Sequence, residues 1–173
     1  CGHAQIVETV LDILKKTGCA PQALKLEITE SVLTNNMNNV TASLVRLRDH
    51  GIESSIDDFG TGYSSLGYLH RFPSSTLKID RSFVGGLSHE HDSLEIVRTI
   101  VTLARSLYMS VVAEGIETIQ QLDQLRRLRC DQGQGYLFAK PLDASAAEAL
   151  LRSTPNFLAL SEAADLPVEL ARP

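Results

Sequence analysis

The sequence predicts an α/β fold, a (β/α)8 TIM-like barrel that is incomplete, with about five of its eight strand–helix units. Strand-like and helix-like periodicity alternate along the chain, which is typical of parallel strands joined by helical crossovers. Strand starts recur about every 27 residues. A complete barrel needs roughly 250 residues, whereas the chain has 173. A doubly wound sheet is the alternative, but no Gly-rich dinucleotide loop follows the first strand.

The first part of the chain predicts two helices and a strand. Apolar residues recur at helical spacing over 6–14, and Gly18 is a typical helix stop. Residues 24–29 alternate apolar and polar side chains, which predicts a strand. A second helical stripe covers 37–47 and ends before Gly51.

The middle of the chain predicts three more strands around a long helix. A strand over 52–57 leads into a Gly-rich loop, and residues 66–71 form a brief helical turn before the strand 77–80. The longest helix is expected over 93–107. It precedes the most continuously apolar strand, 109–114.

The last part repeats the alternation once more. A helical stripe over 119–128 precedes a short strand near 134–138 and a last helix over 144–151. We therefore expect one domain over 1–152, lacking its first strands, and a C-terminal tail over 153–173, where periodicity is weak.

Composition excludes several classes of protein. Hydrophobic residues make up 43% and charged residues 21% of the chain, which is ordinary for a globular domain. The net charge of −5 argues against a partner that is a nucleic-acid polymer, because such binders need a basic face. No apolar run approaches the roughly 18 residues of a membrane span, so no membrane contact is expected from this chain.

The cysteines and the first residue bear on location. Cys1, Cys19 and Cys130 fit neither a disulfide framework nor a zinc pattern, so we expect a reducing, cytoplasmic setting. Because the chain starts with Cys rather than Met, we expect it to begin inside a longer protein, which could itself be anchored in a membrane.

Polar side chains mark the far end of every predicted strand. They are Glu27, Glu30, Asp57, Asp58, Lys78, Asp80, Glu114, Glu117 and Gln134. In a barrel these ends converge on one face, where catalytic groups gather. Two unit charges about 4 Å apart repel by about 4 kcal/mol at an effective dielectric near 20. So many acids in one place are therefore tolerated only if they are protonated or bound to cations.

The residue types favour a hard divalent ion. Oxygen ligands without His or Cys suit Mg²⁺ or Mn²⁺, with Ca²⁺ as a further option. The adjacent Asp57 and Asp58 can serve two neighbouring ions, an arrangement that activates water against a phosphodiester. Lys78 offers a positive charge for the phosphoryl group.

Each residue also has an ordinary structural interpretation. An isolated acid at a strand end is usually exposed or caps a helix, and Glu30 would then simply begin the next helix. Lys78 would pair with Asp80. The functional interpretation therefore depends on repetition across every strand.

Five segments together carry a resemblance to a known family. They are LEITES (26–31), DDFGTGYSSL (57–66), LKIDRSFV (77–84), VVAEGIET (111–118) and QGYLFAKPL (134–142). In this order they resemble the EAL-domain family, whose members are cyclic-di-GMP-specific phosphodiesterases. The resemblance implies a (β/α)8 barrel that, when intact, hydrolyses one phosphodiester bond of cyclic-di-GMP to linear pGpG with one or two Mg²⁺ or Mn²⁺ ions.

The resemblance also implies residue roles. The metal ligands would be Glu27, Asp57, Asp58, Asp80 and Glu114. Either Glu114 or Lys78 would activate water. The supporting or substrate-contacting residues would be Glu30, Glu117 and Gln134. Glu30 would steady the loop 58–65, which in this family links metal binding to dimerisation, so a homodimer through this loop is implied.

One part of the family pattern is missing. The Glu-Ala-Leu motif that names the family and a downstream Asn supply metal ligands early in the domain. The tripeptide 148–150 has the same letters but belongs to the Ala-rich last helix. We therefore expect the chain to match the C-terminal two-thirds of the domain and to be inactive by itself.

Two other functions stay open. The first is a non-catalytic cyclic-di-GMP receptor or interaction module, although the matched segments keep their acids. The second, ranked behind it, is an unrelated barrel enzyme that forms a Schiff base through Lys78.

Overall fold

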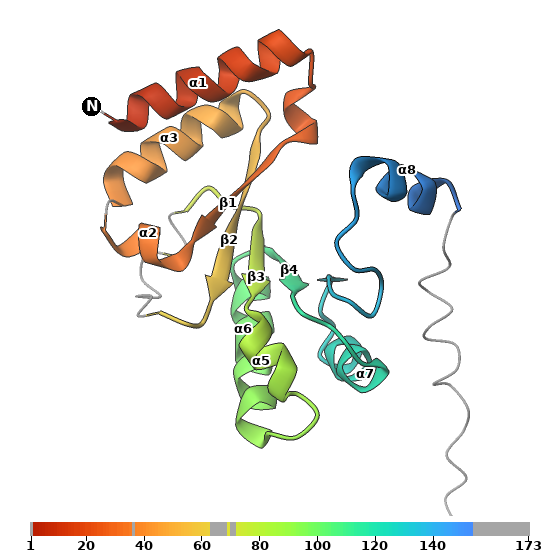
Figure 1. Ribbon diagram of the computed structural model, residues 1–173. Helices are drawn as coiled ribbons and strands as arrows, with labels where there is room; N and C mark the ends of the chain where they lie inside the picture. Colours follow the sequence, from red (N-terminus) through yellow and green to blue (C-terminus); the bar gives the residue numbers. More distant parts are fainter. Residues whose placement is uncertain (1, 36, 63–68, 70–71, 154–173) are drawn as a thin grey trace, which may run out of the picture.

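Strands and helices alternate throughout the computed structural model, which describes residues 2–35, 37–62, 69 and 72–153 (Figure 1). The elements are α1 (Gly2–Thr17), the 3-10 helix η1 (Pro21–Ala23), β1 (Lys25–Thr29), α2 (Glu30–Asn35), α3 (Met37–Asp49), β2 (Glu53–Phe59), β3 (Thr76–Ile79), α5 (Arg81–Gly86), α6 (His91–Ser106), β4 (Ser110–Ala113), α7 (Ile119–Arg127), β5 (Gln132–Gly133) and α8 (Ala144–Arg152). The predicted α/β class is confirmed.

The five strands form one parallel sheet whose spatial order, β1-β2-β3-β4-β5, is also their order in the sequence. Parallel neighbours need a crossover between them. Helices supply it between β1 and β2, between β3 and β4 and between β4 and β5, whereas residues 63–68 and 70–71 of the segment between β2 and β3 lie outside the described residues. Within the described residues the sheet ends at β1 on one side and at β5 on the other, so it does not close into a barrel. Five units of an open barrel-like sheet are what the sequence predicts.

One face of the sheet is apolar and packs on helices. Ile56, Leu77 and Val111 are fully buried on neighbouring strands. α3 packs on β2, while α6 packs on β3 and β4 through its own buried stripe, which includes Val97 and Ala104. α1 lies beside α3 (Figure 1). The helical stripes in the sequence therefore mark the helix faces that cover the sheet.

The opposite face, which we call the inner face, is polar. Strand side chains alternate between the two faces. Lys25 and Glu27 of β1 therefore lie on the inner face, and Leu26 and Ile28 lie on the apolar face. The inner-face residues of the next three strands are Glu53, Ser55, Asp57, Thr76, Lys78, Ser110 and Val112. Closed barrels usually fill this space with branched apolar side chains. Here polar groups occupy both ends of the inner face, and the ends differ in chemistry.

The structure corrects some predicted elements. The strand predicted over 134–138 is wrong: β5 spans Gln132–Gly133, and the chain then turns. A Cβ on Gly135 would lie 2.1 Å from the carbonyl oxygen of Ile116, so this glycine passes against another segment's backbone. The short helices α2 and α5 are additional to the predicted elements.

Two predicted segments fall largely outside the described residues. Of the helical turn at 66–71, only Leu69 is described, and of the tail at 153–173, only Ser153. In the part of the chain that is described, no helix combines the length and apolar character that crossing a membrane requires.

Candidate metal and catalytic site

A buried lysine meets three carboxylates at the carboxyl end of the inner face. Lys78 Nζ lies 2.6 Å from Glu27 Oε1, 3.0 Å from Asp57 Oδ1 and 2.7 Å from Glu114 Oε1. The Lys78 side chain is 8% exposed, whereas that of Glu27 is 51% exposed. We call these four residues the Lys78 cluster. They come from β1, β2, β3 and the residue after β4, and they show that Lys78 pairs with carboxylates on other strands rather than with Asp80.

A β-bulge brings two adjacent aspartates to the same site. Consecutive strand residues normally point to opposite faces. The pairing of β2 with β3 shifts register between Ile56 and Phe59, and Asp58 has φ 53°, in the left-handed region that Asp tolerates better than most residues. As a result, carboxylate oxygens of Asp57, Asp58 and Glu114 all lie within 4.8 Å of one another.

Glu30 holds the chain that follows the bulge. It begins α2, is 3% exposed, and its Oε2 accepts a hydrogen bond of 2.8 Å from the backbone N–H of Gly60. Gly60 has φ 102°, and a Cβ there would lie 2.8 Å from the Phe83 ring, so another residue does not fit without displacing the ring. Residues 63–65 of the predicted dimerisation loop lie outside the described residues.

Asp80 caps a helix beside the site. Its Oδ1 accepts hydrogen bonds from the Ser82 backbone N–H at 2.9 Å and the Ser82 hydroxyl at 2.5 Å, so it is the N-cap of α5. Burial raises the pKa of Asp80, but these hydrogen bonds outweigh burial and leave the pKa below its ordinary value. The structural interpretation of Asp80 as a cap is therefore correct, whatever else the residue does.

Asp58 and Lys78 have shifted pKa values for opposite reasons. Burial raises the pKa of Asp58, and the charges of Asp57 and Asp80 raise it further. Burial opposes the charge of Lys78, but its contacts with Glu114, Glu27 and Asp57 outweigh burial and raise the pKa of Lys78 well above its ordinary value. A Schiff base forms only from a neutral amine, so this environment argues against the Schiff-base enzyme.

The donor set at this end fits a hard divalent ion. The side chains of Asp57 and Glu114 are mostly buried, at 20% and 17% exposed. The buried Asp57 Oδ1 accepts no hydrogen bond of good geometry from any described residue, and the Lys78 ammonium lies beside it. One ammonium leaves the three carboxylates of Asp57, Asp58 and Glu114 with excess negative charge, and carboxylate oxygens are the ligands that Mg²⁺ and Mn²⁺ prefer.

The structure does not join Glu117 and Gln134 to this cluster. Glu117 lies after β4 and Gln134 directly after β5, and both are exposed. Among the described residues, no hydrogen bond or ion pair connects either side chain with Lys78 or its three partners. The backbone N–H of Glu117 donates instead to Gln121 Oε1 at 2.8 Å, at the start of α7.

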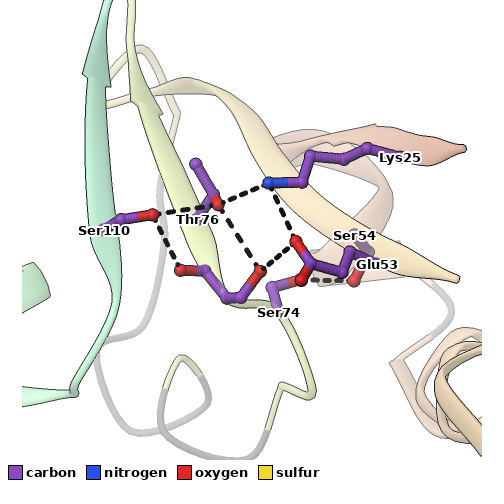
Figure 2. A network of polar contacts seen from close by, with 7 residues as sticks. Lys25, Glu53, Ser54, Ser74, Thr76 and Ser110 are labelled. Atoms are coloured by element: carbon purple, nitrogen blue, oxygen red, sulfur yellow. Dashed lines mark hydrogen bonds and ion pairs between the residues drawn. The ribbon is translucent and has the colours of Figure 1, made fainter. Parts of the chain in front are cut away.

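A second polar cluster, which sequence reasoning missed, lies at the amino end of the same face (Figure 2). Lys25 Nζ lies 3.0 Å from Glu53 Oε2 and donates to Thr76 Oγ1 at 3.0 Å. Hydroxyls of Ser75 and Ser110 bond to Glu53 and Thr76 at 3.2 and 3.1 Å. We call these five residues the Lys25 network. The sequence signal that could have predicted this network is the polar residue at or next to the start of each of these strands.

Comparisons with known proteins agree on one family. A model described as the EAL domain matches residues 1–141. Cyclic di-GMP phosphodiesterase NbdA of Pseudomonas aeruginosa is 46% identical over 152 residues, which cover 88% of this chain and 19% of that protein. The bifunctional diguanylate cyclase/cyclic di-GMP phosphodiesterase MucR of the same organism is 45% identical, over 87% of this chain and 22% of that protein. The chain thus spans about a fifth of the length of these curated relatives.

Solved structures show the same likeness in three dimensions. The MucR phosphodiesterase in complex with c-di-GMP superposes with a TM-score of 0.81 at 44% identity, covering 84% of this chain and 59% of that one. A manganese and cyclic-di-GMP complex of Klebsiella pneumoniae BlrP1 gives a TM-score of 0.74 at 32% identity, over 81% of this chain and 36% of that one.

Proposed function

The chain belongs to the EAL domain family, and from this premise we propose that it takes part in the metal-dependent hydrolysis of one phosphodiester bond of cyclic-di-GMP to linear pGpG. The observation that carries the proposal is the meeting of Asp57, Asp58 and Glu114 within 4.8 Å beside a charged lysine. The MucR and BlrP1 structures, which are complexes with c-di-GMP, support the choice of substrate.

The inner-face carboxylates are the proposed metal ligands. The full set for one or two Mg²⁺ or Mn²⁺ ions is Glu27, Asp57, Asp58, Asp80 and Glu114. A divalent ion held there would lower the pKa of a water molecule and offset charge on the phosphoryl oxygens. Lys78 would stabilise the negative charge that develops on the phosphate. Because the ammonium already carries its proton, the proton of the attacking water would go to Glu114.

Other predicted residues take supporting roles in this proposal. Glu30 would hold the bulge through its hydrogen bond to Gly60, Gln134 would contact the substrate, and Glu117 would support the site from behind. We also propose a homodimer through the loop 58–65. The family resemblance supports this, and the hydrogen bond from Gly60 to Glu30 ties the start of that loop to the first residue of α2, directly after the strand that carries Glu27.

Domain boundaries and location are proposals of the same kind. We propose one EAL domain over 1–152 with a tail over 153–173; the family match over residues 1–141 supports a domain that occupies most of the chain. A cytoplasmic location is supported by the two described cysteines, Cys19 and Cys130, which are free thiols.

The test is a product assay. Cyclic-di-GMP is incubated with the 173-residue chain, and with a longer polypeptide that contains it, in Mn²⁺ or in EDTA, and pGpG is measured by chromatography. We expect Mn²⁺-dependent pGpG from the longer polypeptide, none from D57N, and none from the 173 residues alone. Binding of cyclic-di-GMP without pGpG from the longer polypeptide would indicate the receptor instead.

A further inference from the structure

The Lys78 ammonium contacts two of the carboxylates, Asp57 and Glu114, that the proposed function assigns to a divalent ion. It lies 3.0 Å from Asp57 Oδ1 and 2.7 Å from Glu114 Oε1. Mg²⁺ binds carboxylate oxygens at about 2.0–2.1 Å. An ion bound to these two oxygen atoms would therefore lie close to the Lys78 ammonium, and the two positive charges would repel each other. The divalent ion and the ammonium therefore compete for these oxygens, and each binds them more weakly in the presence of the other.

We propose that Lys78 is an internal competitor of the metal, whose ammonium gives up Asp57 and Glu114 when a divalent ion binds. This inference rests on the proposed function, since it concerns the same site. It goes beyond that function because it gives Lys78 a second role. In addition to stabilising charge on the phosphate, Lys78 sets the affinity of the site for the ion.

The geometry offers the ammonium a place to go. The group whose oxygens can share one ion is Asp57, Asp58 and Glu114, and it does not include Glu27. Glu27 Oε1 lies 2.6 Å from Lys78 Nζ, and the Glu27 side chain is the more exposed one, at 51%. A lysine has a flexible four-carbon stem. When one ion uses this group, and Glu27, a ligand of the larger proposed set, stays outside it, Lys78 can keep Glu27 as its partner while it releases the two deeper carboxylates.

The same charge then has two opposite effects. Without a divalent ion, Lys78 offsets the repulsion among buried carboxylates and stabilises the fold. When the ion arrives, this favourable pairing must be lost, so the ion binds more weakly than it would to the carboxylates alone. Removal of the charge should therefore lower stability and raise metal affinity together, a combination that simple loss of structure does not produce.

The experiment measures Mn²⁺ binding to chelator-treated protein by calorimetry, with K78Q compared to the wild type. We expect the Kd of K78Q to be about tenfold tighter, which corresponds to about 1.4 kcal/mol. We expect its melting temperature without Mn²⁺ to fall by about 5 °C. The matched control is K25Q, which removes the lysine at the other end of the same face, away from Asp57, Asp58 and Glu114. The Kd of K25Q for Mn²⁺ should equal that of the wild type.

The outcomes separate the inference from the proposed function. If the wild type binds Mn²⁺ and K78Q binds it equally or more weakly, the inference is wrong and the metal site stands. If neither protein binds Mn²⁺, both are wrong. K78R, which keeps the charge, should bind no more tightly than the wild type, and a tenfold gain there would contradict competition by charge.

A labelling measurement on the wild type needs no variant to fold. An amine-reactive acylating reagent is applied with and without Mn²⁺, and the modified lysines are quantified by mass spectrometry. Labelling of Lys78 should rise several-fold with Mn²⁺, because the amine loses two carboxylate partners, while labelling of Lys25 stays constant. Unchanged or reduced labelling of Lys78 in the Mn²⁺-bound protein would overturn the inference.

Discussion

Two lysines point from the same face of the sheet, one at each end, and the negative charge around them differs. At the amino end, Lys25 has one carboxylate partner, Glu53, and the rest of its network consists of hydroxyls such as that of Thr76. At the carboxyl end, Lys78 touches three carboxylates, and Asp58 adds a fourth acid beside them. The amino end is electrically balanced and the carboxyl end is not.

The difference separates a structural cluster from a candidate site. The Lys25 network satisfies its own hydrogen bonds and joins four strands, so it needs no ligand. The Lys78 side chain is 8% exposed, against 43% for Lys25, and excess negative charge around a buried lysine costs free energy unless another cation shares it. Charge balance and burial, more than the presence of polar residues, therefore point to the carboxyl end.

The largest expected difference is in turnover. E114Q removes a carboxylate from the Lys78 cluster, while E53Q makes the same change in the Lys25 network. We expect E114Q to lower kcat for pGpG formation by at least about 100-fold, because the residue is a proposed ligand and proton acceptor, and E53Q to leave kcat within about twofold. Steady-state assays in Mn²⁺ on the longer polypeptide measure both. A comparable loss in E53Q would erase the distinction between the two ends.

A divalent ion should stabilise only one of the two ends. At about 100 times its Kd, a ligand that binds only the folded state adds about 2.7 kcal/mol, or about 5–10 °C in melting temperature for a chain of this size. We expect this shift with Mn²⁺ in the wild type and in E53Q, and its loss in D57N. Scanning calorimetry with and without EDTA measures it. A full shift in D57N would place the ion elsewhere.

The sequence predicts most of the fold because local patterns carry it. Alternating residues mark β1, and the apolar stripe over 93–107 marks α6, observed at His91–Ser106. The strand near 134–138 was misplaced because the turn after β5 depends on the close approach of Gly135 to another segment, which local alternation does not encode. The sequence places an acid, Asp80, directly before Arg-Ser, which is compatible with a helix cap. The same acid is also compatible with the metal site, so the sequence alone does not decide between the two roles.

The candidate site is predictable in part of its membership and less so in its geometry, since the structure does not join the predicted Glu117 and Gln134 to the Lys78 cluster. Repetition of acids at strand ends identifies Glu27, Asp57 and Glu114. That Lys78 would meet all three depends on register across four strands, and that Asp58 would face the same way depends on a bulge. Both are tertiary features. The charge balance that distinguishes the two ends is likewise visible only after the strands are paired.

The backbone offers a third comparison, with an intermediate effect. The carboxyl end relies on left-handed residues, including Gly60 at φ 102°, whereas the Lys25 network lies on regular strands. We expect G60A to cost about 1–3 kcal/mol of unfolding free energy, because the new Cβ is strained and meets the Phe83 ring. The matched S110A removes one hydroxyl and should cost about 1 kcal/mol. Urea unfolding measures both, and a G60A cost no larger than that of S110A would show that position 60 accepts a Cβ without strain.

The smallest expected effects have opposite signs at the two ends. Hydrogen bonds from Lys25 and Ser75 lower the pKa of Glu53, so its ionised form stabilises the fold and that contribution is lost as pH falls through the folded-state pKa. Burial, then the charge of Asp57, raises the pKa of Asp58, so its ionised form is unfavourable in the fold and acidification relieves it. In EDTA at pH 7, E53Q should therefore melt below the wild type.

D58N should melt above the wild type under the same conditions, because Asn tolerates the left-handed backbone of Asp58 and carries no charge. Each difference should be under about 1 kcal/mol, since both groups are screened by solvent. Both should shrink as the pH falls towards about 4, because each difference depends on the ionised form of its carboxylate. Melting curves between about pH 7 and pH 4 follow both variants. A D58N protein less stable than the wild type at pH 7 would mean that the carboxyl end is not short of positive charge, and the contrast between the two lysines would then rest on burial alone.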